Sequence, residues 1–434
     1  MKLISSCLLF VAVVTFITSP AWSQSDTTAQ SGSENAKPKK KDKKVNAFIV
    51  PALASNPTAG FMYGISGIVN SRLGPAETTQ LSDGMVAIIY TTKKQSMNLI
   101  KTNVFLKNDS WNLKGDWRLF FSSQPTFGLG TGPQSAKLVS SGIEISEGVF
   151  SKPVPDEQMM EFSYIRFHEA AMKRLGNTRF FAGLGLHYDY HYDISDHLLD
   201  LNDTNPSITS HYAYSKEMGF NPEKYTLFGL SLNGLYDNRD NPVNPYHGRY
   251  AYVSWRFNPE FMGSDKNSSI LWLEYRDYFN LSKKRPRHMI AMWTYASLVT
   301  GGKVPYMDLP ALGWDQFGKS GRGYLQGRFR GKELIYGELE YRVPLPAIIK
   351  KNPDLFGAVA FVNATTASNN FNFSTNNTQV NGYNEIKLFD YINPGYGIGL
   401  RVMVMKKSRA NLTLDYAWGD YGSQGFYFNF NETF

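Results

Sequence analysis

The sequence predicts an all-β protein, a sixteen-stranded antiparallel transmembrane β-barrel, and three observations predict it. Short segments rich in Tyr, Phe, Val, Ile and Leu recur from Val45 onward, separated by Gly, Asn, Pro and Ser. Several of these segments alternate apolar and polar residues, which is typical of strands with two different faces. Long and short connections alternate along the chain, as they do in bacterial outer-membrane barrels.

The start of the chain indicates export. A positive pair, Met1-Lys2, precedes an apolar run, and the small residues Ala21 and Ser23 follow it. The run is short for a membrane-spanning helix, which needs about 20 residues. We therefore interpret residues 1–23 as a secretory signal peptide.

A polar segment, residues 24–44, follows and ends in a lysine-rich run. Its composition predicts a disordered, basic periplasmic tail, with a contact to anionic lipid headgroups or an acidic partner as the alternative. Cys7 falls in the signal peptide, so the mature chain is predicted to hold no disulfide and no thiolate metal site. Residues 45–434 remain for the transmembrane β-barrel.

We expect sixteen strands, most of about 10 residues, which is the length of a tilted membrane strand. An even number lets a barrel close with antiparallel neighbours. The strands are predicted to start near Val45, Ala59, Asp83, Ser96, Ser110, Glu161, Thr178, Pro222, Gly248, Ser269, Arg287, Gly331, Leu355, Gly395, Arg409 and Gln424.

The alternation of apolar and polar residues assigns a lipid face and a lumen face. In residues 248–258, one face carries Ala, Val, Trp and Phe, and the other carries Tyr, Ser, Arg and Asn. Residues 270–279, 395–405 and 411–418 show the same pattern, although Asp277 interrupts the apolar face. One face suits lipid and the other a polar lumen.

The lengths of the connections form an independent test. The long gaps follow strands five, seven, eleven and thirteen, all of them odd, so they lie on one side. A soluble sandwich has no reason to sort its loops in this way, whereas a barrel has short periplasmic turns and long outer loops. The long gaps are residues 123–158, 194–221, 301–330 and 365–394.

Two segments could carry chemistry, and we interpret neither in that way. Residues 313–320 match the phosphate-loop pattern, but they lie in a glycine-rich loop without the strand before and the helix after that phosphate binding needs. A possible metal set shares one strand face, but a polar lumen face opposite a tyrosine belt explains it better: His187, Asp189, His191 and Asp193. We find no Gly-x-Ser-x-Gly and no His-Glu-x-x-His, so no enzyme activity and no cofactor are expected.

The sixth outer loop carries the sequence Gly-Arg-Gly-Tyr at residues 321–324. Its glycines allow tight folding, and its arginines need acceptors. If the loop folds into the lumen, Arg322 can meet acidic residues of the predicted strands, where an unpaired charge would be costly. The alternative is an exposed surface loop. The candidate partners of Arg322 are Glu338, Glu340 and Asp415.

Two further segments stand out on the periplasmic side. The turn after strand eight is predicted to be rigid because of its Pro and Asn content, and its marked residues are Asp237, Arg239, Asn241, Pro242, Pro245 and Gly248. The chain also ends on a strand whose aromatic residues share one face, interrupted by Glu432, which we expect at headgroup depth. These aromatic residues are Phe426, Phe428, Phe430 and Phe434.

Together these segments resemble the BamA/TamA family of outer-membrane assembly and translocation barrels. In that family, an Arg-Gly-aromatic motif of the sixth outer loop folds into the lumen, and Arg322-Gly323-Tyr324 matches it. The turn 237–248, residues 414–419 and the C-terminal targeting signal at Phe428, Phe430 and Phe434 also fit. The resemblance implies an outer-membrane location and insertion or export of proteins or lipids through a weak seam between the first and last strands.

The sequence departs from this family in one respect. Typical members carry periplasmic POTRA domains before the barrel, and residues 24–44 leave no room for one between the signal peptide and the first strand, Val45–Ser55. The expected partners are therefore outer-membrane lipids, a POTRA-bearing or chaperone-like periplasmic protein, and unfolded barrel clients, with no nucleic acid. Pro51 in the first strand is consistent with a weak seam. A passive channel or structural barrel is the alternative function.

Overall fold

The computed structural model describes residues 45–434 apart from residues 57–59, 134, 136–141, 147–148, 317, 347–354, 371–384 and 407. The predicted signal peptide and basic tail lie outside the described residues. No helix in the part that is described is long and apolar enough to cross a membrane.

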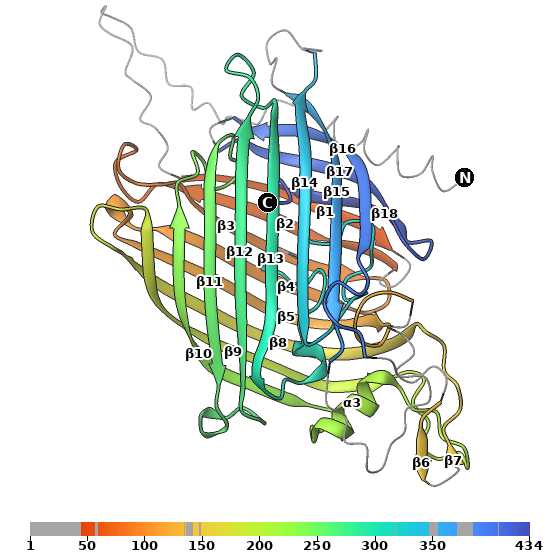
Figure 1. The fold of residues 1–434 in the computed structure, drawn as a ribbon. Helices are drawn as coiled ribbons and strands as arrows, with labels where there is room; N and C mark the ends of the chain where they lie inside the picture. The colour runs from red at the N-terminus through yellow and green to blue at the C-terminus, as the bar shows by residue number, and fades with distance from the viewer. Residues whose placement is uncertain are drawn as a thin grey trace, which may run out of the picture. The chain divides into compact units, whose positions relative to one another are not determined.

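Sixteen strands form one antiparallel sheet in chain order, which confirms the predicted fold class (Figure 1). Each strand begins within three residues of its predicted start. The strands are β1 (Val45–Asn56), β2 (Gly60–Ser71), β3 (Ser82–Thr91), β4 (Ser96–Phe105), β5 (Trp111–Thr126), β8 (Gln158–Arg174), β9 (Phe180–Asp196), β10 (Tyr225–Asp237), β11 (Gly248–Asn258), β12 (Ser268–Asn280), β13 (Met289–Gly302), β14 (Glu333–Pro344), β15 (Phe356–Ser368), β16 (Asn393–Met405), β17 (Ala410–Gly419) and β18 (Gln424–Phe430).

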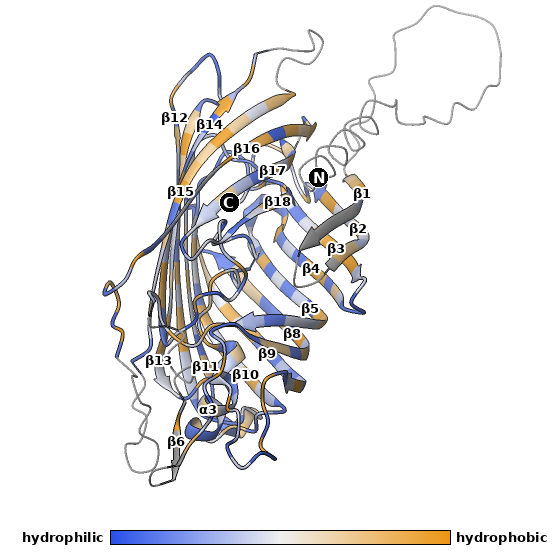
Figure 2. Cartoon of the chain, turned by 90° about the vertical axis from the view of Figure 1, so that its right-hand side faces the viewer, coloured by the Kyte–Doolittle hydropathy of each residue, from blue (hydrophilic) through white to orange (hydrophobic). Residues whose placement is uncertain are grey.

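The sheet curves round so that β1 to β5 pass behind β11 to β13 in Figure 1. Hydrophobic and hydrophilic residues alternate along the strands (Figure 2). In β14, Leu339 and Tyr341 are each 46% exposed on the outer face, while Glu338 and Glu340 are buried on the lumen side. The period-two pattern therefore predicts the two faces correctly, because side chains of a strand point alternately to its two sides.

The long connections after β5, β9 and β13 lie at one end of the sheet, as predicted from their odd positions, and we call them the outer loops. The one after β5 contains a small hairpin of β6 (Glu144–Ser146) and β7 (Val149–Phe150), and the one after β9 contains α3 (Ser210–Met218). Within the described ranges, single turns of 3-10 helix lie at Lys107–Asp109, Glu260–Met262 and Tyr306–Asp308.

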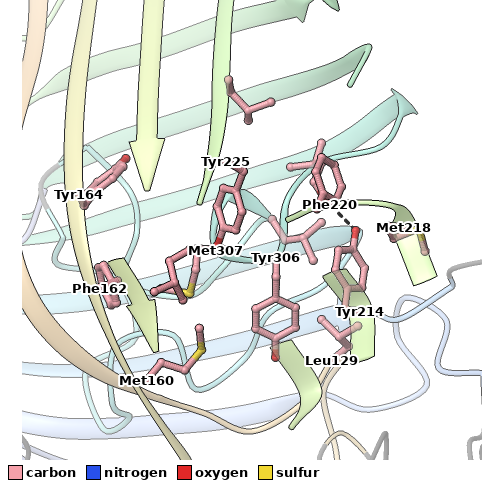
Figure 3. Packing of buried hydrophobic residues seen from close by; sticks show 14 of the residues in the cluster. Leu129, Met160, Phe162, Tyr164, Tyr214, Met218, Phe220, Tyr225, Tyr306 and Met307 are labelled. Atoms are coloured by element: carbon pink, nitrogen blue, oxygen red, sulfur yellow. Dashed lines mark hydrogen bonds between the residues drawn. The ribbon is translucent and has the colours of Figure 1, made fainter. Parts of the chain in front are cut away.

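The outer loops pack against the lumen side of β5, β8 and β10 in one cluster of buried apolar residues (Figure 3). The Tyr214 hydroxyl on α3 donates to the Val304 carbonyl at 2.8 Å. The hydroxyls of Tyr306 and Thr126 share a hydrogen bond of 2.6 Å. These contacts fix the outer loops to one another and to β5, and they fill part of the lumen.

The two edge strands, β1 and β18, meet through side chains. Among the described residues, no register of paired strands joins them. The rings of Phe48 and Phe430 lie edge to face with centroids 5.4 Å apart. Phe48 is on the lumen side of β1, because it pairs in register with the buried Ile68. Phe430 shares a strand face with the exposed Phe426, so the outer face of β18 packs here against the inner face of β1.

Candidate functional site

The connection between β13 and β14, residues 303–332, enters the lumen, and we call it the lumen loop. It is held by contacts with β5, with the connection after β5 and within the loop itself. The Gly130 amide donates to the Arg330 carbonyl at 2.7 Å, and the Arg118 guanidinium of β5 donates to the Asp315 carbonyl at 3.1 Å. The Arg330 guanidinium donates to the carbonyls of Tyr306 and Met307, each at 2.8 Å. The predicted inward folding of this loop is thereby confirmed.

Arg322 lies at the centre of a buried ionic network. Its Nη1 donates to Asp415 Oδ2 at 2.6 Å, and its Nη2 donates to Glu338 Oε1 at 2.7 Å and also to Glu340. The guanidinium carbon also lies 3.5 Å from the centroid of the Phe361 ring. The structure thus brings Arg322 together with all three acidic residues that the sequence marked as candidates.

Sequence reasoning missed two further cations of this network. Arg342 Nε donates to Glu340 at 2.6 Å, and Arg401 Nη1 donates to Asp415 at 2.5 Å. Three carboxylates buried together would repel one another strongly in a low-dielectric interior, so the additional cations balance their charge. The signal that could have found Arg401 is its position on the lumen face of β16.

The residues that follow Arg322 attach the lumen loop to the last strands. Gly323 N donates to the Tyr427 hydroxyl at 2.9 Å. Tyr324 donates to the Pro394 carbonyl and accepts from the Asp420 amide at 3.0 Å. The whole Arg-Gly-Tyr motif therefore docks on the segment of wall that runs from β14 to β18.

Gly323 is required by this docking. Its φ is +106°, a backbone conformation that residues with side chains rarely adopt. A Cβ atom at this position would lie 2.6 Å from the Trp418 carbonyl oxygen. Only glycine lets the loop backbone approach β17 this closely.

The prediction for the chain end is wrong in one respect. Phe428 and Phe430 lie in β18 as expected, but the strand stops at Phe430. Asn431 takes the left-handed conformation, with φ +61°, and turns the last residues inward. Phe434 therefore does not continue the outer face of the strand, and its targeting role stays a prediction.

The physical reason for the turn is the charge of Glu432. It does not lie at headgroup depth, as expected from the alternation, but in the lumen, where it accepts from Arg401 Nε at 2.6 Å and Asn411 Nδ2 at 2.5 Å. The Phe434 ring packs beside Trp293 with centroids 5.4 Å apart. A buried ion pair and an apolar contact together hold the chain end inside the barrel.

The segment that resembles a phosphate loop has a structural role here. No helix follows it, and Asp315 accepts hydrogen bonds from the amide and the hydroxyl of Ser320. Lys319 Nζ donates to the carbonyls of Phe430 and Glu432, both at 2.7 Å. The lysine that would hold phosphate in a nucleotide site holds the chain end instead.

The predicted periplasmic turn is more than a short connection. Arg239 pairs with Asp237 through two hydrogen bonds of 2.9 and 2.6 Å. Asn241 caps the turn by accepting from the amides of Val243 and Asn244 at 2.8 and 3.1 Å. Gly248, with φ +106°, lets the chain return close to Asn238. A Cβ atom at position 248 would lie 2.6 Å from the Asn238 carbonyl oxygen.

The same turn reaches distant strands. Asn244 Nδ2 donates to the Arg409 carbonyl at 3.0 Å, and Arg409 Nη1 donates to Asp240 at 2.5 Å. Val243 packs with Leu81 and with Ala410 of β17. Of the other marked residues, the Pro242 carbonyl accepts from Arg239 at 3.3 Å, and Pro245 precedes the return to Gly248. The turn therefore connects the β10–β11 region with the β16–β17 region.

Comparison with known proteins adds the family. The Omp85 superfamily domain matches residues 161–434. The chain belongs to the Omp85 superfamily. It is thus an outer-membrane barrel homologous to protein insertion and secretion transporters. A comparison with curated proteins found no match.

This Omp85 barrel was also compared with solved structures. BamA from Haemophilus ducreyi lacking POTRA domains 1–3 is 16% identical, with a TM-score of 0.52 over 91% of this chain and 70% of that one. CdiB from Acinetobacter baumannii is 12% identical, with a TM-score of 0.47 over 90% of this chain and 60% of that one. At such identities, the first likeness supports the fold alone.

The histidine-rich stretch of this Omp85 barrel lies in β9. His187, Asp189 and His191 are buried on the lumen side. Asp189 lies within hydrogen-bond distance of Arg166, His168 and Arg256, at 2.8, 2.7 and 2.5 Å, so two arginines and a histidine surround it. The expectation that Asp193 shares this face is wrong, because its φ of +51° interrupts the alternation and exposes its side chain.

Replacing Lys319 by methionine is expected to free the chain end of the Omp85 barrel. The variant loses the charged donor to the carbonyls of residues 430–432, and such hydrogen bonds contribute about 1.5–3 kcal/mol each. We expect carboxypeptidase to remove Phe434 about tenfold faster than from the unmodified barrel. Lys332→Met, at the other end of the lumen loop, is the control. Equal digestion of both variants and the unmodified barrel would contradict a holding role for Lys319.

Proposed function

We propose that this Omp85 barrel assists the insertion or export of proteins at the outer membrane by opening between β1 and β18. The observation that carries the proposal is the seam, where, in the described part of the chain, the edge strands meet through Phe48 and Phe430 and no strand register joins them. A side-chain contact costs less to break than a ladder of backbone hydrogen bonds. Pro51 adds to this weakness, because proline removes one ladder donor from an edge strand.

The filled lumen also supports the proposal over the passive channel. The lumen loop, its ionic network and the chain end occupy space that an open pore would leave to water. A client that crosses or enters the membrane would then use the seam rather than the lumen. Lipids are the second class of client that such a seam could admit.

A covalent tether across the seam tests the proposal. Phe48→Cys and Phe430→Cys, joined by a short reducible crosslinker, should abolish insertion of an unfolded barrel client into vesicles, and reduction should restore it. The control pair is Leu230→Cys and Phe257→Cys, which lie opposite each other in an existing ladder. Full client insertion by the tethered barrel, together with steady conductance in planar bilayers, would favour a passive channel.

The proposal includes a periplasmic partner that delivers clients. Pull-down of the tagged, membrane-embedded barrel followed by mass spectrometry should recover a POTRA-bearing or chaperone-like periplasmic protein. The matched sample is the tethered variant, which should keep the same partner because the tether leaves the periplasmic turns unchanged. Recovery of no such protein from either sample would count against the delivery step.

A further inference from the structure

A groove lies on the outer wall of β9 to β14, away from the lumen network. Its volume is about 590 Å³, within the range of about 300–1,000 Å³ that is usual for small-molecule sites. The floor forms where outward side chains are small, so that the sheet backbone is uncovered. These small residues are Ala182, Gly234, Ala251, Thr294 and Ala296.

Larger apolar side chains border the groove. The rings of Phe180 and Tyr236 lie tilted against each other at one border, with centroids 4.8 Å apart, and Ile335 of β14 lies at the other. A flat wall offers an acyl chain contacts on one side, whereas a groove offers them on three. Dispersion contacts accumulate with the number of neighbouring atoms, so a chain in the groove is held more firmly.

The groove has the depth of one membrane leaflet. It begins at Leu175 in the periplasmic turn before β9 and reaches Ala296, seven residues into β13 from Met289. Seven residues span about 24 Å along a strand, or about 17 Å of depth at a tilt of about 45°. Half of a hydrocarbon core of about 30 Å is about 15 Å. The groove therefore faces the periplasmic leaflet.

A cation borders this groove on the turn side of β11, outside the residues that line it. Arg249 is on the same outward face of β11 as Ala251, two residues nearer the turn. Its Nε donates to Asp277 Oδ2 at 3.1 Å, and Asp277 also accepts from the Tyr275 hydroxyl at 2.8 Å. The Arg249 side chain is 58% exposed. Its two Nη atoms make no hydrogen bond or ion pair with any of the described residues. They are available to a headgroup, and guanidinium groups fit phosphate well.

We propose that the groove binds one glycerophospholipid of the periplasmic leaflet, with an acyl chain along the floor and the phosphate on Arg249. The apolar floor, the depth of one leaflet and the cation at the headgroup level all fit this occupant. The inference rests on the outer-membrane location of the barrel and not on its proposed role in insertion. Its success or failure is therefore independent of the seam.

Native mass spectrometry of the barrel, released from vesicles of phosphatidylethanolamine and phosphatidylglycerol, tests the apolar part. The unmodified barrel should retain one phospholipid after mild removal of detergent. Ala251→Leu with Ala296→Leu fills the floor and should lower this retention about tenfold. Ala360→Leu, on the exposed outer face of β15, is the matched control and should retain the lipid. Equal retention in all three would mean annular lipid only and would overturn the proposal.

The headgroup contact is tested by Arg249→Gln, which should also lower retention about tenfold, because charge-assisted hydrogen bonds are among the stronger ones. Arg285→Gln removes an exposed cation from the turn between β12 and β13 and should have no effect. Heat-modifiability of every variant shows that the barrel is folded. A folded Arg249→Gln variant that retains the lipid fully would overturn the assignment of the phosphate.

Discussion

Replacing Arg322 by alanine is expected to lower the free energy of unfolding by about 3–5 kcal/mol and to reduce the yield of folded barrel. The substitution leaves Glu338, Glu340 and Asp415 buried without their shared cation. Arg342 and Arg401 remain, and two cations balance four carboxylates when Glu432 is included. Unfolding in urea, followed by heat-modifiability on gels, measures the effect.

Two variants separate charge from geometry in this network. Arg322→Lys keeps the charge but loses the planar fork that reaches three carboxylates, so it should fall between the unmodified barrel and the alanine variant. Adding Glu338→Gln to Arg322→Ala removes one unbalanced carboxylate and should recover part of the stability. Unchanged yield and an unchanged unfolding midpoint in Arg322→Ala would show that the network does not brace the lumen loop.

Gly323→Val is expected to have the second largest effect, about 2–3 kcal/mol of destabilisation. Valine is strained at a φ of +106°, and its Cβ would lie 2.6 Å from the Trp418 carbonyl oxygen. The loop must move away from β17, and it then loses the hydrogen bond from the Gly323 amide to Tyr427. Trypsin should cleave the loop at Arg322 or Arg328 in the folded barrel.

The matched control for this substitution is Gly337→Ala in β14. Nothing lies within 4 Å of the position that its Cβ would take, so the strand accepts it without a shift. This variant should resist trypsin and keep the unmodified unfolding midpoint. A Gly323→Val barrel that behaves in the same way would contradict the tight docking of the loop on β17.

The wall of the barrel could be predicted from the sequence because its signals are local. Alternating residues assign the faces of each strand, and turn residues mark its ends. The same alternation along the strands places Glu338, Glu340 and Asp415 on the lumen side. Arg322 can meet them there once the loop folds inward.

The features that the sequence did not predict depend on single residues that interrupt a strand and on contacts between residues far apart in the chain. The alternation extends smoothly through Phe430, and nothing in it signals the left-handed residue Asn431 that turns the chain end inward. Asp193 breaks its strand in the same way. The contact between Arg409 and Asp240 joins residues 169 positions apart, and no pattern along the chain reports such a distance.

The inward chain end also constrains the order in which this barrel can fold. Arg401 obtains its carboxylate partner Glu432 only when the last three residues of the chain have arrived. The lumen loop docks on β14 to β18, so it can dock only after these strands, which follow it in the chain, have formed. Contacts between distant parts of a chain form late because closing long loops is entropically costly. A barrel truncated at Phe430 would keep every strand and still lack the counter-ion that completes its interior.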